Sequence, residues 1–190
     1  MQWVIAGLGN PGSEYIGTRH NTGRDFLHDI EKKEGEKGLP AGRQGKLFGT
    51  KVALITPDVY MNNSGGPLKK LVPSKAAAAK LIVLHDELDL PLGKVKISFG
   101  SSAGGHNGVK SVIAALKTQD FTRIRIGISP STPGGKLKRP DGEKIVDFVL
   151  GKFKPAEAEK LKKSRKLVAE AIEIILKEGV QKAMMQIHSK

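Results

Sequence analysis

The stretch WVIAGLGNPG, residues 3–12, fits either an α/β protein that binds a dinucleotide or one whose first loop borders a site without a nucleotide cofactor. An apolar run at 3–6 predicts a buried strand, and the glycines at positions 7, 9 and 12 spell the G-x-G-x-x-G of a dinucleotide-binding loop. In that loop the third glycine leads into a helix, and an acidic residue ends the second strand about 20 residues later. Here Pro11-Gly12 predicts a turn, and HDIEKKEG at 28–35 is typical of a helix end. The stretch therefore favours a loop that borders a site and argues against a nucleotide cofactor.

Short β-branched runs predict the other strands of an α/β sheet, at 51–56, 81–85, 94–99 and 123–128. Helical periodicity predicts helices over 107–118 and 155–178 and a short last helix over 180–188. Pro155 suits a first helical turn, and Gly179 suits a stop. Because strands and helices interleave, we predict one α/β domain over residues 1–190, with a mixed, largely parallel twisted sheet flanked by helices. The segments 35–46 and 129–144 are rich in Gly, Pro and charge, which predicts loops.

The composition is that of a basic protein. The 32 Lys+Arg outnumber the 19 Asp+Glu, and the formal net charge of +13 favours a polyanionic partner, nucleic acid before membrane. A basic protein without such a partner is the alternative. The absence of cysteine excludes disulfides and thiolate metal sites. No apolar run approaches the roughly 20 residues that span a bilayer, and no signal segment is apparent, so we predict a soluble cytoplasmic protein.

Four polar clusters fall at the ends of predicted strands or at the start of a predicted helix, where open α/β sheets place their sites. They are Asn10, Met61-Asn62, His85-Asp86 and His106-Asn107, and His20 follows the first loop closely. Turn chemistry explains the asparagines at 10 and 62 equally well, and a helix cap explains 106–107. We nevertheless expect all of them to lie in loops, because they contribute to no apolar stripe.

These residue types are suited to general-base hydrolysis. A neutral imidazole takes a proton from water near pH 7, and a carboxylate beside it stabilises the imidazolium that forms. Asparagine amides can hold the oxyanion of a tetrahedral intermediate, an effect of about 3 kcal/mol per donor. A His–Asp pair with several asparagines therefore fits hydrolysis of an activated acyl bond, an ester more readily than an amide.

Two other chemistries have weaker support. Residues 100–104, GSSAG, formally match the nucleophile elbow G-x-S-x-G around Ser102, but the chain is short for an α/β-hydrolase and a small-residue turn explains the pattern. A metal site could form if the polar clusters converged, yet none of the candidates has a ligand spacing such as H-x-x-x-H. Those candidates are His20, His85, Asp86 and His106.

Two predicted strands carry cations on one face. Lys94, Lys96 and Ser98 alternate with apolar residues in one strand, and Arg123 and Arg125 alternate with isoleucines in the other. Such a face suits a phosphate backbone. Ordinary outward-facing charge on an amphipathic sheet is the alternative.

Five motifs in series resemble those of bacterial-type peptidyl-tRNA hydrolase, from residue 4 to about residue 153. They are GLGNPGSEYIGTRHN (7–21), YMNNSG (60–65), HDELDLPLG (85–93), GGHNGVKSV (104–112) and FTRIRIGI (121–128). The resemblance implies a monomeric enzyme that recycles tRNA by cleaving the ester between a peptide and the 3′-terminal ribose, without a metal or organic cofactor. It also implies C-terminal helices near the active-site crevice.

The resemblance assigns roles residue by residue. His20 is the general base, Asp86 its partner, and Asn10 distinguishes a blocked α-amino group from a free one. The other matched residues are implied to hold the peptide or the tRNA, with either Asn62 or Asn107 polarising the carbonyl. They are Tyr15, Tyr60, Met61, Asn62, His106, Asn107 and Arg125.

One position departs from the family pattern. Some relatives pair a lysine with the arginine matched by Arg125 to clamp the 5′ phosphate of tRNA, but Ser98 occupies the lysine position here. Lys96, on the same strand face, is our suggested replacement. Two alternative hypotheses stay open: the protein is a catalytically silent RNA-binding relative, or it is a serine or metal hydrolase.

Overall fold

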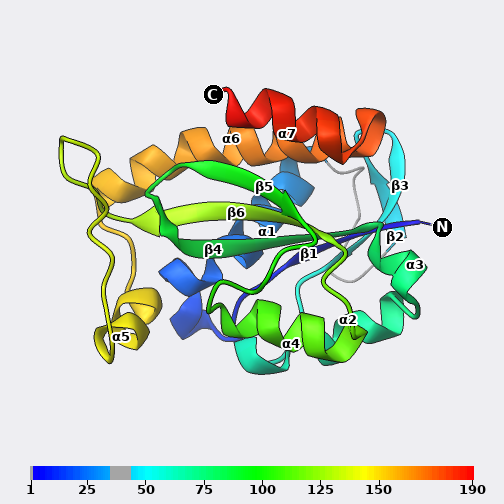
Figure 1. Cartoon of the computed structure of the whole chain (residues 1–190), viewed down its shortest axis with the longest axis horizontal. Helices are drawn as coiled ribbons and strands as arrows, with labels where there is room; N and C mark the ends of the chain where they lie inside the picture. The colour runs from blue at the N-terminus through cyan, green and yellow to red at the C-terminus, as the bar shows by residue number, and fades with distance from the viewer. Residues whose placement is uncertain (1, 35–43) are drawn as a thin grey trace.

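The computed structural model describes residues 2–34 and 44–190, and within them the chain forms a six-stranded sheet in the order β2-β3-β1-β4-β6-β5 (Figure 1). The inner strands β3, β1, β4 and β6 pair in parallel, whereas the edge strands β2 and β5 pair antiparallel with their neighbours. The predicted mixed, largely parallel sheet is therefore confirmed. The strands are β1 (Trp3–Gly7), β2 (Gln44–Leu47), β3 (Thr50–Ile55), β4 (Leu81–Pro91), β5 (Val95–Phe99) and β6 (Thr122–Ser129).

Helices cover both faces of this sheet (Figure 1). The helices α1 (Thr22–Glu34), α6 (Pro155–Glu178) and α7 (Val180–His188) lie on one face, and α2 (Gly65–Leu71), α3 (Lys75–Ala78) and α4 (Asn107–Leu116) lie on the other. Strand alternation explains the two cores, because Ile5 and Ile82 point into the first while Val4 and Val83 point into the second. Both faces of the inner strands are thus buried, as a parallel sheet requires.

The structure differs from the sequence prediction mainly in short elements. The end of the predicted loop at 35–46 is wrong, since 44–46 belong to β2; residues 35–43 lie outside the described residues. A four-residue edge strand with the sequence QGKL has no apolar alternation that could reveal it. The helices α2, α3 and α5 (Lys144–Leu150) were also not predicted. The segment between β6 and α5 is irregular, with one isolated bridge between Ser131 and Leu137, as its composition predicts.

The topology brings several loops to one end of the sheet. The chain leaves β1 through the 3₁₀ turns η1 (Ser13–Tyr15) and η2 (Arg19–Asn21), and the third such turn is η3 (Met61–Asn63). Parallel strands end at the same edge of a sheet, so β1 and β4 deliver their carboxyl-end residues close to the start of α4. Among residues 2–34 and 44–190, no helix is long and apolar enough to cross a membrane.

Candidate active site

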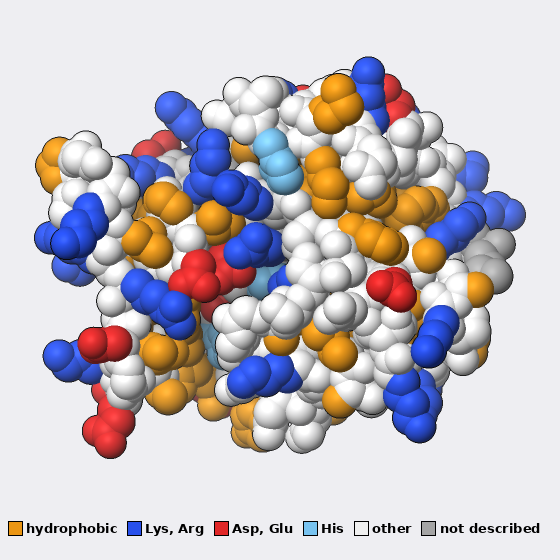
Figure 2. Space-filling model, in the orientation of Figure 1, with side chains coloured by type: hydrophobic (Ala, Val, Ile, Leu, Met, Phe, Trp, Pro, Cys, Tyr) orange, Lys and Arg blue, Asp and Glu red, His pale blue; other side chains and the backbone are white. Residues whose placement is uncertain are grey.

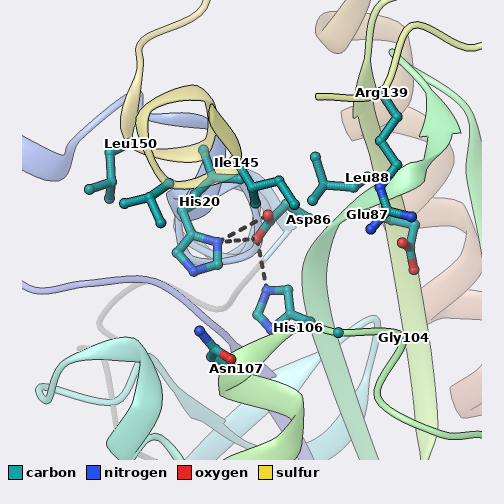
Figure 3. A pocket seen from close by; sticks show the side chains of 13 residues that line it. His20, Asp86, Glu87, Leu88, Gly104, His106, Asn107, Arg139, Ile145 and Leu150 are labelled. Atoms are coloured by element: carbon teal, nitrogen blue, oxygen red, sulfur yellow. Dashed lines mark hydrogen bonds and ion pairs between the residues drawn. The ribbon is translucent and has the colours of Figure 1, made fainter. Parts of the chain in front are cut away.

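His20, Asp86 and His106 meet at this end of the sheet (Figure 3). His20 Nδ1 lies 3.1 Å from Oδ1 and 3.0 Å from Oδ2 of Asp86. His106 Nε2 lies 2.9 Å from Oδ1 of the same carboxylate. The three residues come from η2, from β4 and from the position that caps α4, so the fold creates a contact between residues far apart in the chain.

The hydrogen bonds determine which ring nitrogen of each histidine carries the proton. An ionised carboxylate only accepts, so both imidazoles donate to Asp86. The backbone N–H of Val109 donates to His106 Nδ1 at 3.2 Å, which leaves Nε2–H of His106 as the donor to Asp86. His20 donates through Nδ1–H, and its Nε2 is therefore the nitrogen with a free lone pair. His106 thus caps α4, as the sequence alternative suggested, and also orients the carboxylate.

Burial and the facing charges change the pKa values of the His20–Asp86 pair. Burial lowers the pKa of His20, but the charge of Asp86 and the hydrogen bond to it raise the pKa, and the net effect is a value above 6.5. Burial raises the pKa of Asp86, yet the two imidazoles hold it well below its usual range. Asp86 therefore stays ionised and stabilises the protonated form of His20.

His85 supports this cluster from behind. Its Nδ1–H donates to the backbone oxygen of Asp86 at 2.7 Å, and its Nε2 faces Nη1 of Arg123 at 3.4 Å. Its ring packs edge-on against His106, with the centroids 4.7 Å apart. Burial, together with the neighbouring His106 and Arg123, holds the pKa of His85 well below 6.5, so the ring is neutral. His85 therefore packs the cluster as an uncharged ring.

Asn10 is fixed by a network of its own. Asn21 accepts from the backbone N–H of Asn10 at 2.8 Å and donates its side-chain amide to the Asn10 carbonyl at 2.9 Å. The side-chain oxygen of Asn10 accepts from the backbone N–H of Met61 at 2.8 Å. This bond directs the amide NH₂ of Asn10 away from η3. The network joins η2, which carries His20, to η3.

A cavity of about 260 Å³ opens beside the histidine–carboxylate cluster. One wall carries the polar groups His20, Asp86, His106 and Asn107 (Figure 3). The apolar part of the lining comes from Leu88 and from one side of α5, and Glu87 and Arg139 also border the cavity. The α5 residues that line it are Ile145, Val146, Val149 and Leu150, of which Val146 is 58% and Leu150 39% exposed. The crevice can therefore hold an apolar group next to His20.

The remaining predicted residues lie around this centre. Tyr15 and Tyr60 form an edge-to-face pair with centroids 6.4 Å apart, and Asn62 and Asn107 are exposed. Met61 is less available to hold the peptide or the tRNA than the resemblance implies, because its side chain is buried in the second core. The exposed Lys96 lies opposite Arg125 in the β5–β6 ladder.

Arg125 and Arg123 are less available than the strand pattern suggested. Arg125 Nε donates to the buried carboxylate of Glu87 at 2.8 Å, which offsets its charge. Arg123 is itself buried and donates to the carbonyl of Ser102 at 2.7 Å. Buried arginines need such partners, and an alternating strand pattern alone does not reveal that they have them. Of the predicted cationic face, Lys96 is exposed, and Lys94 and Arg125 are partly exposed.

The same cluster could hold a metal ion. One ligand atom from each of His20, Asp86 and His106 lies within 4.8 Å of the others. The sequence spacing gave no sign of this convergence, because the ligands come from three separate elements. Each of these atoms is also engaged in the hydrogen bonds described above.

Several residues in and around the crevice were not predicted from the sequence. Asn21 and Arg19 flank His20 within the quoted motif, and their adjacency to it was the available signal. Glu87 lines the cavity, and its adjacency to Asp86 was likewise a signal in the sequence. The apolar side of α5 had no signal, since five of its seven residues are apolar and show no single stripe.

The fold and the site together are those of an α/β enzyme with a histidine–carboxylate pair in a crevice at the carboxyl end of its sheet. A family model for peptidyl-tRNA hydrolase matches residues 4–190. The chain therefore belongs to the peptidyl-tRNA hydrolase family.

Known members of that family resemble it over nearly their full length. The peptidyl-tRNA hydrolase of Carboxydothermus hydrogenoformans is 41% identical over 188 residues, covering 96% of both chains. That of Thermotoga maritima is 42% identical over 183 residues, covering 95% of this chain and 94% of the relative. A crystal structure of peptidyl-tRNA hydrolase from Acinetobacter baumannii superposes with a TM-score of 0.81 at 30% identity, covering 98% of this chain and 94% of that one.

Proposed function

We propose that this peptidyl-tRNA hydrolase cleaves the ester of peptidyl-tRNA with His20 as general base and Asp86 as its partner. Water attacks the ester carbonyl carbon while Nε2 of His20 takes its proton, which gives a tetrahedral oxyanion and an imidazolium. The intermediate then expels the 3′ oxygen of the ribose, which recovers the proton from His20. The products are a peptide with a free carboxyl group and an intact tRNA. The observation that carries this proposal is the pair of 3.0–3.1 Å contacts from His20 Nδ1 to Asp86, which leave Nε2 free.

The asparagines suit the acyl side of the substrate. Because the side-chain oxygen of Asn10 is occupied by Met61 N–H, its NH₂ can donate to a peptide carbonyl, which a blocked aminoacyl group has and a free one lacks. Asn107 lines the cavity beside His20, so its amide is our candidate for the oxyanion contact. Asn62 is exposed on η3, and we assign it to hold the 3′ end.

Other residues suit the tRNA side. Tyr15 and Tyr60 offer aromatic faces on which the terminal base can stack. Lys96 is our main phosphate contact, with Arg125 assisting, because Arg125 already pairs with Glu87. Both ring nitrogens of His106 bind within the protein, so we assign it to orient Asp86 instead of the substrate role expected from the resemblance.

The rival readings predict different kinetics. We expect the protein to release acetyl-amino acid from N-acetyl-aminoacyl-tRNA over many turnovers and to leave free aminoacyl-tRNA largely intact. We expect Ser102→Ala and added chelator to leave this rate unchanged, because neither a serine nor a metal takes part in the proposed steps. A silent RNA-binding relative would show no turnover. A large loss with Ser102→Ala or with chelator would support the serine or the metal hydrolase and contradict the proposal.

We further infer that the protein acts as a monomer in the cytoplasm, as the family resemblance implies. Light scattering of the purified protein and fractionation of cells that produce it test these two inferences. A stable dimer, or a protein found in the membrane fraction, would contradict them.

A further inference from the structure

Arg19, the residue before His20, is a buried charge without a part in the proposed chemistry. Its side chain is 9% exposed. Burying a guanidinium is costly unless other groups compensate for the water it loses. A residue that only solubilised the loop would lie in the solvent, so the position of Arg19 needs another explanation.

Two later segments hold its guanidinium. Nη2 pairs with Oε2 of Glu157 at 2.9 Å, near the start of α6, and Nη1 donates to the carbonyl of Phe148 at 3.3 Å, near the end of α5. The guanidinium carbon also lies 4.4 Å from the centroid of the Phe148 ring and 5.1 Å from that of Phe153. The side chain therefore connects η2 to both ends of the link between α5 and α6.

The backbone makes the same connection. Arg19 N–H donates to the carbonyl of Gly151 at 3.0 Å, and Thr18 forms a bridge with Lys152. Glu157 is itself fixed, because its Oε2 also accepts from the backbone N–H of Lys154 at 2.8 Å in the capping box of α6. The guanidinium thus binds a carboxylate whose position is already set.

The two elements joined in this way pack against each other beside the cavity. The turn η2 carries His20, and α5 supplies apolar residues of the cavity lining (Figure 3). We propose that Arg19 is a positioning residue, which holds His20 against Asp86 and holds α5 at its distance from them. This inference rests on the proposed function, since it assumes that His20 is the base.

The test compares two arginines that make the same kinds of contact. Arg165 pairs with Asp29 at 2.9 Å and lies 5.0 Å from the Phe26 centroid, and neither of these partners lines the crevice. We expect Arg19→Lys, which loses the planar fork, to lower kcat on N-acetyl-aminoacyl-tRNA by about tenfold or more with tRNA affinity little changed. We also expect the acid limb of kcat/KM to move to lower pH, because a loosened contact with Asp86 raises the pKa of His20 less. Arg165→Lys should lower Tm without changing kcat or the acid limb.

A second variant tests the same contact in case Arg19→Lys does not fold. Glu157→Gln keeps an acceptor for Arg19 and should shift kcat and the acid limb in the same direction by a smaller amount. If both variants fold and show the kcat and pH profile of the wild type, the inference is overturned. The inference is also overturned if the loss of kcat for each degree of Tm lost is the same in Arg165→Lys as in Arg19→Lys. Loss of activity in His20→Ala with a normal Arg19→Lys contradicts this inference alone, whereas full activity in His20→Ala contradicts the proposed function itself.

Discussion

At the scale of the residue, the site consists of one carboxylate shared by two imidazoles in different roles. His106 is held by α4 on one nitrogen and by Asp86 on the other, so it is fixed in place. His20 is held on Nδ1 alone, so its other nitrogen is available to water. In the proposed mechanism, one type of side chain therefore serves both as support and as base, and the hydrogen bonds around each ring determine which role it takes.

The pKa of His20 leads to a prediction about pH. The base acts deprotonated, so kcat/KM should rise with pH through the pKa of His20, which Asp86 holds above 6.5. Asp86→Asn removes the charge that raises this pKa and leaves the burial that lowers it. We expect the acid limb to move to lower pH and kcat to fall about a hundredfold or more.

Asp89→Asn is the matched control for the pH experiment. Asp89 is an exposed neighbour that pairs with Arg139 at 2.6 Å and does not touch His20. This variant should keep the acid limb and the kcat of the wild type. An acid limb that stays in place in Asp86→Asn would show that another group sets it.

At the scale of the element, two adjacent glycines of α2 test how closely α2 and α4 pack. A Cβ at Gly65 would lie 2.2 Å from the carbonyl oxygen of Ser111 in α4, whereas a Cβ at Gly66 would meet nothing within 4 Å. We expect Gly65→Ala to lower the free energy of unfolding in urea by about 1–3 kcal/mol, because the helices must move apart. Gly66→Ala should leave it unchanged or raise it by about 0.5–1 kcal/mol. Equal values for the two variants would contradict the close packing.

The elements also show how far the sequence predicts the fold. Helix α6 begins at Pro155 and ends before Gly179 as predicted, since its caps and its apolar stripe are local signals. By contrast, α5 packs against η2 and lines the cavity, so contacts with residues distant in the sequence stabilise this helix. The sequence predicted β4 to end at residue 85, but it runs on to Pro91 and places Asp86 inside the strand. Extended pairing with β6 is a tertiary effect that a local pattern does not contain.

The site, like the fold, was predicted only in part from the sequence. The sequence predicted His20 and Asp86 as a pair from residue chemistry and family resemblance, and the structure brings them into contact. It did not predict that His106 shares the carboxylate or that Arg19 reaches Glu157, 138 residues away. Such contacts depend on which elements become neighbours in the folded chain, and no spacing along the sequence encodes that.

At the scale of the whole molecule, the charge of +13 is spread out. Figure 2 shows lysine and arginine side chains scattered over the visible face instead of gathered in one patch. Charge that is scattered in this way attracts tRNA but does not orient it, so orientation depends on a few contacts near the crevice.

Substitution of Lys96 tests whether this lysine makes one of those contacts. We expect Lys96→Ala to weaken tRNA binding and to reduce the slope of log affinity against log salt by about one unit, because one fewer counterion is released. Lys51→Ala removes another exposed lysine, from β3 toward the other edge of the sheet, and should change the slope little. Equal slopes for Lys96→Ala and the wild type would remove Lys96 from the phosphate contacts.

The most direct test of the account is the turnover number of His20→Ala on N-acetyl-aminoacyl-tRNA at saturating concentration, measured together with its affinity for tRNA. Because the proposed base acts in the chemical step and the proposed phosphate contacts lie elsewhere, we predict that kcat falls by about a thousandfold while the affinity stays within about twofold. A variant that binds tRNA and releases the acyl group at the wild-type rate would contradict the assignment of His20 as the base.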